Sequence, residues 1–480
     1  MKRYLSILPF AALIGLIAVC IGTFGTDALE GATQVSLLIA SGICVFVGFL
    51  MGRVDWAGLE HELGVKTASC MPAIIILLLI GAIGGTWMVS GIVPTMIYYG
   101  VQVLRPEWFL VSSSLFCALV SVMVGSSWTT VATIGVALMG VGRALGMDEG
   151  WVAGSIITGA YFGDKLSPLS DTTVLASSVA GTPLFTHIHY MMTTTIPTFC
   201  VSLLVFLVAG LLMDVPGGAD VAFLEQLTDT FLISPWLLCV PVLTGLMIAR
   251  RWPAMVVLFL AALMAAVVTV VWQPELIAQI AGVETEATGS AIQLYEGVMK
   301  VVYAPTNLHT GSAVLDELVH TSGMTGMMPT IWLIICAQVF GGAVTATGVL
   351  ADVMGLLLRA VRGTAGLVAG TVLTGLFCNV ALADQYLSII LTSSIFKDTY
   401  AKRGYEPRLL SRTCEDSTTV TSVLVPWNTC GLVQSTVLGV ATLTYLPYCF
   451  FNLLSPLTSI VVAAMGWGIK KSSVTQEASD

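Results

Sequence analysis

Two short stretches of this chain combine carboxylates with hydroxyl side chains inside an otherwise apolar sequence. Residues 163–173 read GDKLSPLSDTT, and residues 415–429 read EDSTTVTSVLVPWNT. A dehydrated alkali cation needs hard oxygen ligands, and carboxylates, hydroxyls and unwound backbone carbonyls supply them. A carboxylate removed from water is unstable when it is charged and alone, so it holds either a proton or a cation. These residue types therefore predict a site at which Na+ and H+ compete.

The candidate ion-binding residues come from both stretches and from the polar pair at 384–385. We expect the following side chains to bind the ion or a substrate: Asp164, Ser167, Asp171, Thr172, Thr173, Asp384, Gln385, Asp416, Ser417, Thr418 and Asn428. A further polar segment, residues 125–130, is typical of a re-entrant hairpin, and we expect its hydroxyl side chains to line that hairpin: Ser126, Ser127, Thr129 and Thr130.

Several of these polar residues could have a purely structural role instead of binding an ion. A lone hydroxyl in a membrane helix commonly bonds its own backbone instead of a ligand. Glu415 could simply lie at the membrane interface beside Arg412, and we expect His187 and His189 at the membrane surface rather than in a proton relay. Lys165 could form a permanent ion pair with Asp164, which the sequence leaves open.

The composition shows what must surround such a site. Of 480 residues, 56% are hydrophobic and only 10% are charged, which is too few polar side chains to cover a soluble globule of this size. The net charge is −9, and no block of Lys and Arg is long enough to suggest binding to nucleic acid. The 11 cysteines show neither paired nor metal-binding spacing, and we expect no cofactor. Membrane lipid is therefore the expected partner of most of the surface.

Apolar runs of bilayer length give the expected membrane spans. We expect plain spans at 5–25, 33–52, 70–98, 187–213, 231–249, 253–272, 328–358, 363–380 and 431–469, the last long enough for two helices. No cleavage site follows the first run, so we expect no signal peptide. Gly, Pro and polar residues interrupt 108–180 and 382–430, where a continuous lipid-exposed helix is therefore disfavoured. Transporters commonly place their binding sites in such broken segments.

The distribution of positive charge predicts the orientation in the membrane. If the spans alternate, one side receives Lys2, Arg3, Arg53, Lys66, Arg250, Arg251, Arg359, Arg362, Lys470 and Lys471. We expect this side to face the cytoplasm, with the protein in the inner (cytoplasmic) membrane of the cell and both termini in the cytoplasm. The acidic segment 273–327 is expected to be an external loop.

An internal repeat is the most informative pattern in the chain. Residues 84–93 (GGTWMVSGIV) match residues 341–350 (GGAVTATGVL) without a gap, at an offset of 257. The flanking charges have opposite bias, so we expect two inverted repeats, although close packing of small residues could also produce such a match. The expected division is 1–69 for N-terminal helices, 70–214 for repeat one, 215–327 for connecting helices and the external loop, 328–470 for repeat two, and 471–480 for a cytoplasmic tail.

The strings at 163–173 and 180–188 (AGTPLFTHI), together with 415–431 and 451–456 (FNLLSP), resemble the NhaC-type sodium/proton antiporters of the ion transporter superfamily. The resemblance implies an all-α polytopic membrane protein with two inverted repeats, re-entrant hairpins, broken helices and elevator-like alternating access. It also implies Na+ and H+ as partners. Val174 and Val423 depart from the family pattern, and similar relatives carry malate, lactate or amino acids. A Na+-coupled exchanger of such organic solutes, and a homodimer, therefore stay open.

Two other classes fit the sequence less well. An enzyme would need an activated nucleophile or a metal, yet the chain contains neither an HExxH nor a GxSxG string. A channel is commonly built from symmetric subunits, whereas an inverted repeat within one chain favours alternating access. We therefore predict a secondary Na+/H+ antiporter.

Overall fold

The computed structural model describes residues 5–24, 31–213, 221–250, 252–281, 291–306, 316, 319–353 and 363–469. Within these ranges the chain is almost entirely helical and has no named strand, only a β-bridge between Thr306 and Thr321. Seven helices are long and apolar enough to cross a membrane, and two sharply bent helix pairs raise the number of candidate spans to as many as nine. The predicted class, an all-α polytopic membrane protein, is confirmed.

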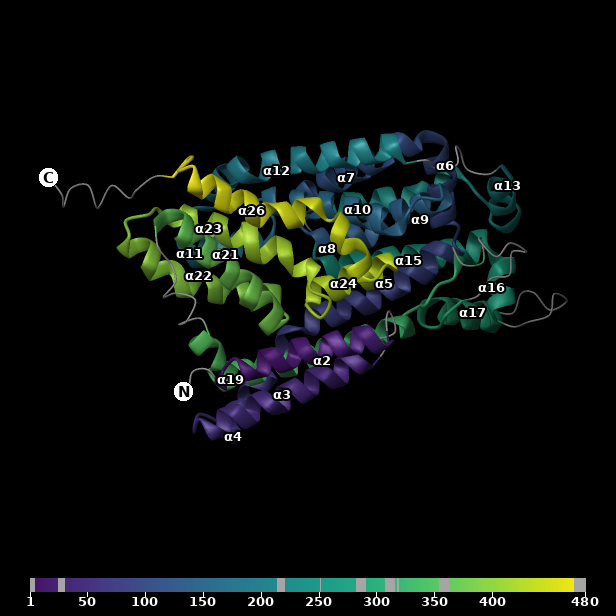
Figure 1. Cartoon of the computed structure of the whole chain (residues 1–480). Helices are drawn as coiled ribbons and strands as arrows, with labels where there is room; N and C mark the ends of the chain where they lie inside the picture. Colours follow the sequence, from purple (N-terminus) through teal and green to yellow (C-terminus); the bar gives the residue numbers. More distant parts are fainter. Residues whose placement is uncertain are drawn as a thin grey trace.

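Figure 1 shows the arrangement of the helices along the chain. The helices up to residue 230 are α2 (Leu8–Phe24), α3 (Ala32–Leu50), α4 (Trp56–Ser69), α5 (Met71–Val89), α6 (Ile92–Val103), α7 (Pro106–Val124), α8 (Ser127–Thr130), the π-helix η2 (Val131–Gly135), α9 (Val136–Ala144), α10 (Glu149–Leu166), α11 (Asp171–Ala180), α12 (Leu184–Leu212) and α13 (Val221–Thr230). After these come η3 (Pro235–Leu238), α14 (Cys239–Ala249), α15 (Ala254–Trp272), α16 (Pro274–Ala281), α17 (Ala291–Tyr303), η5 (Thr325–Met327), α19 (Met328–Ala346), α21 (Gly363–Leu382), α22 (Gln385–Lys402), α23 (Pro407–Cys414), the π-helix η6 (Glu415–Thr419), η7 (Ser422–Leu424), α24 (Thr429–Leu438), α25 (Thr442–Tyr445), η8 (Leu446–Tyr448) and α26 (Phe450–Ala464).

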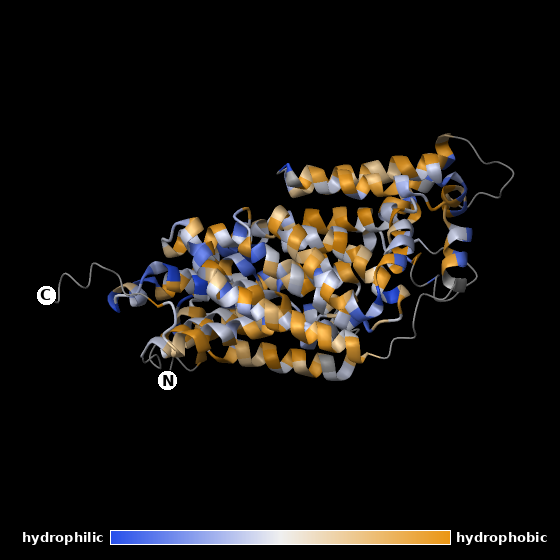
Figure 2. Cartoon of the chain, turned by 90° about the horizontal axis from the view of Figure 1, so that it is seen from above, coloured by the Kyte–Doolittle hydropathy of each residue, from blue (hydrophilic) through white to orange (hydrophobic). Residues whose placement is uncertain are grey.

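The helices form two packed groups with α21 between them. Helices α2, α3, α4 and α19 contact one another in one group, and α7, α10, α12 and α26 do so in the other (Figure 1). Helix α21 contacts α19 in the first group and α26 in the second. Figure 2 shows hydrophobic residues along most of the helix lengths. On α15, Phe259, Leu263 and Val267 form a stripe at helical spacing with 49 to 58% of each residue exposed, as expected for contact with lipid.

Glycines set the distance between α7 and α10. A methyl group at Gly159 would lie 2.0 Å from the Ser114 carbonyl oxygen, and one at Gly163 would lie 2.3 Å from that of Ala118. The two helix backbones therefore touch, as small residues allow in membrane proteins. The same contacts show that α7 and α10 run in the same direction, because later residues of one meet later residues of the other.

The spans predicted as plain helices are mostly observed. One of these spans, one segment predicted to be broken and the predicted external loop need correction. Residues 70–98 are not one helix, because α5 ends at Val89 and Gly91 adopts a left-handed conformation with φ 81° before α6 begins. Segment 108–180 is less broken than predicted, since α7 is a continuous candidate span. The predicted external loop 273–327 contains α16 and α17, and α17 packs against α5. Some residues on which the predictions rest lie outside the described residues. They are Arg251, residues 354–358, Arg359, Arg362 and both charged chain ends.

Candidate functional site

The first hairpin turns at Gly125 and Ser126. Gly125 ends α7 in a left-handed conformation with φ 71°, and Ser126 caps α8 by accepting a hydrogen bond from the Thr129 N–H at 3.2 Å. The chain then returns through α8, η2 and α9. This arm runs antiparallel to α10, because Gly142 lies against Val152 and Gly135 lies against Ile156. Since α7 runs parallel to α10, the two arms of the hairpin are antiparallel to each other.

The second hairpin has the same local construction 258 positions later. Ala383 is the only non-glycine residue with positive φ among the described residues, at 55°. The next residue, Asp384, caps α22 by accepting a hydrogen bond from the Leu387 N–H at 2.8 Å. Helices α21 and α22 then run antiparallel, because Thr371 near the middle of α21 contacts Tyr400 near the end of α22.

Each hairpin lies beside a break between two helices. In the first half, Pro168 occupies the break, Ser170 caps α11, and α11 ends at the left-handed Gly181. At the same offset of 258, Pro426 occupies the break before α24, Asn428 caps that helix, and it ends at the left-handed Gly439. These matching backbone features extend well beyond the ten residues in which the repeat was first recognised. The inverted orientation itself remains a prediction.

Both hairpin turns and both breaks contribute to one cavity of about 770 Å3, which we name the hairpin cavity. Eight of the predicted site residues line it: Ser126, Ser127, Thr129, Asp164, Asp171, Thr172, Asp384 and Gln385. Its wall also includes residues from the start of α5 and from the link between α14 and α15. No Lys, Arg or His is among its described lining residues, so the three aspartates are the charged groups that a ligand meets.

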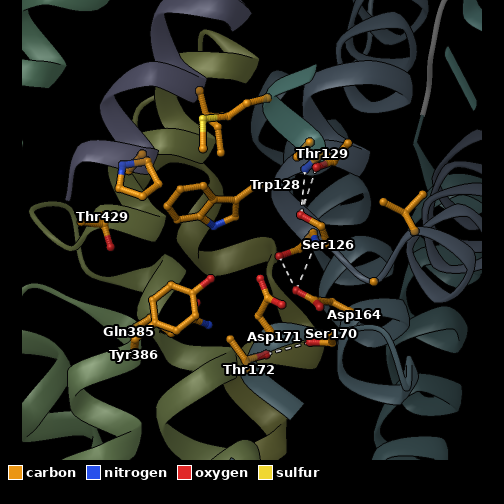
Figure 3. A pocket seen from close by; sticks show the side chains of 18 of the residues that line it. Ser126, Trp128, Thr129, Asp164, Ser170, Asp171, Thr172, Gln385, Tyr386 and Thr429 are labelled. Atoms are coloured by element: carbon orange, nitrogen blue, oxygen red, sulfur yellow. Dashed lines mark hydrogen bonds between the residues drawn. The ribbon is translucent and has the colours of Figure 1, made fainter. Parts of the chain in front are cut away.

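The three aspartates of the hairpin cavity are held differently. Asp164 is buried, and its Oδ2 atom accepts hydrogen bonds from the hydroxyl and the backbone N–H of Ser127 at 2.7 and 3.0 Å. Asp384 is also buried and bonds the start of α22. Asp171 lies at the first position of α11 and is exposed, and Figure 3 shows its carboxylate pointing into the cavity between Tyr386 and Asp164. Asp171 is therefore the carboxylate most accessible to an incoming cation.

The remaining predicted residues do not line the hairpin cavity. Ser167 and Thr173 stabilise the break, because the Ser167 hydroxyl accepts a hydrogen bond from the Leu169 N–H at 3.2 Å and the Thr173 hydroxyl donates one to the Lys165 carbonyl at 3.1 Å. Thr130 bonds its own helix, the bland alternative for a hydroxyl. Asn428 caps α24. Asp416, Ser417 and Thr418 lie on the buried π-helix η6.

In the structure, Asp416 pairs with basic side chains of the protein and does not line the hairpin cavity. Its Oδ1 atom forms an ion pair with Lys165 of α10, and the hydroxyl of Thr194 bonds the same oxygen at 3.1 Å. Arg412 lies 3.6 Å from the other oxygen. The ion pair left open for Lys165 is thus made with Asp416.

Glu415 and His187, for which the sequence suggested a place at the membrane surface, are both fully buried, whereas His189 is exposed. We name Lys165, Arg412, Glu415 and Asp416 the buried charge cluster; each is at most 1% exposed. Sequence reasoning missed this cluster because Lys165 and Asp416 are 251 positions apart and only the folded chain joins them.

Sequence reasoning also missed several residues that line the hairpin cavity. Trp128 and Tyr386 supply aromatic walls, and Ser170 and Thr429 supply hydroxyls (Figure 3). The offset of 257 in the sequence pairs Asp171 with Asn428, whereas the structural offset of 258 pairs it with Thr429, so the sequence match did not point to Thr429. Among the described residues no three His, Cys, Asp or Glu side chains converge closely enough to hold a metal ion by themselves. Binding of an alkali cation here therefore needs hydroxyl, carbonyl or water oxygens in addition to carboxylates.

Comparison with known proteins gives consistent similarities. Residues 159–467 match the model of the Na+/H+ antiporter family. The chain is 36% identical to the Na(+)/H(+) antiporter NhaC of Alkalihalophilus pseudofirmus, over 89% of this chain and 90% of that protein. It is 32% identical to the malate-2H(+)/Na(+)-lactate antiporter of Bacillus subtilis, over 94% and 93%. It is 33% identical to the arginine/ornithine antiporter ArcD of Halobacterium salinarum, over 96% and 92%.

Proposed function

The chain belongs to the Na+/H+ antiporter family and is a secondary Na+/H+ antiporter, and we propose that it exchanges the two ions in the hairpin cavity. The observation that carries this proposal is the meeting of Asp164 and Asp171 from the first half with Asp384 from the second, in one cavity without a basic lining residue. A cavity of this kind attracts cations and offers them carboxylate oxygens from the break between α10 and α11 and from the second hairpin turn.

Competition on these carboxylates couples the two ions. Asp171 receives the cation, Asp164 lies next to it with its geometry set by Ser127, and hydroxyls of Ser126 and Thr172 complete the oxygen set. When Na+ leaves, the buried carboxylate of Asp164 takes up a proton, because an unpaired buried charge is costly. The site therefore changes its access from one side of the membrane to the other while it holds either Na+ or H+. The same change with an empty site is unfavourable.

Alternating access is the way in which a site between two repeats moves ions across a membrane. The hairpin cavity includes Ser69 and Trp252, which neighbour Lys66 and Arg250. The positive-inside rule assigns those basic residues to the cytoplasm, so we assign the cavity to a state that is open to the cytoplasm. We also propose that the protein resides in the cytoplasmic membrane, and the same rule assigns both termini to the inside.

The volume of the hairpin cavity favours a second candidate function. A space of about 770 Å3 is far larger than a bare cation needs, and its aromatic walls suit an organic solute. Relatives named for malate and lactate exchange and for arginine and ornithine exchange give this candidate its solute classes. The lining of three aspartates without a basic side chain opposes an organic anion that arrives without a cation.

Transport by purified protein tests both candidates. The protein is reconstituted into liposomes that contain a pH-sensitive dye, an outward proton gradient is imposed, and Na+ is then added either alone or together with malate, lactate, arginine or ornithine. Na+ alone should dissipate the gradient, and liposomes without protein serve as the control. Dissipation that requires an organic solute together with Na+ would instead establish the second candidate.

A further inference from the structure

The buried charge cluster joins the two halves of the chain. Among the described residues, the ion-pair, hydrogen-bond and cation–π contacts of the Lys165 ammonium group are with the second half: the Asp416 carboxylate, the Ser455 hydroxyl at 3.4 Å and the Phe451 ring at 5.7 Å. Asp164, one position earlier, instead bonds Ser127 of its own half. Neighbouring residues of one helix turn therefore face two different places, the cluster and the hairpin cavity.

Lys165 also connects the two aspartates of the first half. Its carbonyl oxygen accepts the hydrogen bond of the Thr173 hydroxyl, and Thr173 lies in the first turn of α11, which begins at Asp171. The end of α10, which carries Asp164, and the start of α11, which carries Asp171, are thus tied to the same residue. That residue is in turn fixed to the second half through Asp416.

The cluster contains two basic side chains, Lys165 and Arg412, and two acidic ones, Glu415 and Asp416, and none is accessible to solvent. Among the described residues neither Arg412 nor Glu415 has a hydrogen-bond partner; Asp416 pairs with both Lys165 and, at 3.6 Å, Arg412, and the contact with Lys165 is the closer of the two. Removing one partner of a buried pair leaves an uncompensated charge, whereas removing both does not.

We propose that Lys165 is a positioning residue for the Na+ site and that Asp416 is its counter-ion, so that Asp416 neither binds the transported Na+ nor carries the exchanged proton. This inference rests on the proposed function of the hairpin cavity. It reverses the role that the sequence suggested for Asp416, and it explains how a residue outside the cavity can be required for transport.

A double-mutant cycle tests the proposal with Lys165→Met, Asp416→Asn and the double variant in liposomes. Each single variant should lower kcat/KM for Na+ at least about 100-fold, because it breaks the buried ion pair between Lys165 and Asp416. The double variant should recover at least about tenfold over either single variant, with a raised KM for Na+ and the same number of protons moved per Na+ as the unsubstituted protein. A folded double variant that is no more active than Asp416→Asn, or one that moves fewer protons per Na+, would overturn the proposal.

Thr173→Val provides a milder test that does not depend on the stability of the charge variants. Loss of its hydroxyl should raise KM for Na+ by about three- to tenfold and leave kcat and the proton-to-sodium ratio unchanged, because only positioning is weakened. An unchanged KM would contradict the proposal. The function of the cavity is tested separately by Asp164→Asn and Asp171→Asn: if these variants still exchange, the cavity assignment fails whatever the cycle shows.

Discussion

The Asp164 carboxylate accepts two hydrogen bonds from the single residue Ser127, one from its hydroxyl at 2.7 Å and one from its backbone N–H at 3.0 Å. Ser127 is the first residue of α8, immediately after the hairpin turn. The tip of the first hairpin is therefore fixed to the end of α10 through the same carboxylate that lines the cavity. Any rearrangement of Asp164 on ion binding must also act on the hairpin.

Ser127→Ala tests this connection. The substitution removes one of the two hydrogen bonds and leaves the backbone bond, and a hydrogen bond to a charged group contributes about 1.5–3 kcal/mol. We expect KM for Na+ to rise by about tenfold or more with a smaller change in kcat, measured as Na+-driven proton movement in liposomes. Ser178→Ala, outside the cavity on α11, is the control. Equal KM values for the two variants would show that Ser127 does not set the geometry of Asp164.

Asp171→Asn should abolish Na+-driven proton movement, because the amide keeps the shape of the side chain and loses its titrating charge. Insertion into the membrane should be unaffected, since the side chain is exposed in the cavity. Glu60→Gln, which neutralises an exposed carboxylate on α4, serves as the matched control and should transport normally. Retention of more than about a tenth of the unsubstituted flux, equivalent to a loss under about 1.4 kcal/mol in the barrier, would remove Asp171 from the mechanism.

Gly163→Val should destabilise the protein by separating α7 from α10. An added Cβ already falls 2.3 Å from a carbonyl oxygen of α7, and overpacking of this kind costs about 1–3 kcal/mol or more. We expect a lower midpoint of thermal unfolding in detergent, followed by the loss of the monodisperse peak in size-exclusion chromatography. Gly15→Ala is the control, because nothing lies within 4 Å of a methyl group there. Equal midpoints for the two variants would contradict the close contact.

Much of this architecture could be predicted because local chemistry determines it. The apolar runs predicted most spans, and the polar segments at 125–130, 163–173 and 382–385 correctly marked places where helices break. Breaks of this kind are encoded by Gly, Pro and capping residues close in sequence. The second half contains a turn at Ala383 and Asp384 that resembles the one at Gly125 and Ser126, formed without any glycine, while the repeat itself stays a prediction.

The roles of Lys165 and Asp416 could not be predicted in the same way. Asp416 has the residue type and the sequence neighbours of an ion ligand. Only the packing of α10 against the second half shows that its carboxylate is paired with a lysine. Likewise, Glu415 is fully buried, although its sequence neighbours are equally typical of a membrane interface. Long-range pairing of charges depends on the tertiary fold, which residue spacing along one chain does not specify.

The inverted orientation of the repeats is open to a labelling test. We expect a cysteine at Glu149, after the first hairpin, to react with an impermeant thiol reagent from outside the cell, and one at Lys402, after the second hairpin, only from the cytoplasmic side. Each variant is compared with the unsubstituted chain, whose 11 cysteines set the background. Labelling of both positions from the same face would refute the inverted repeat.

The dependence of Na+ affinity on pH separates ion exchange from solute carriage, because it reports whether Na+ and H+ compete for the same carboxylates. If they compete, each unit fall in pH should raise the apparent KM for Na+ by up to about tenfold per competing proton, with little change in maximal rate. The sign follows from the charge: protonation neutralises the carboxylate that the cation needs, so Na+ binds more weakly at low pH. Proton efflux is measured against Na+ concentration at several pH values, with no organic solute present. In a carrier that uses Na+ only as a co-ligand, KM for Na+ would instead follow the solute concentration, and almost no proton would move without solute. A KM for Na+ that stays constant with pH would therefore reject competition at Asp164 and Asp171, and flux that appears only with malate, lactate or an amino acid would establish the solute exchanger.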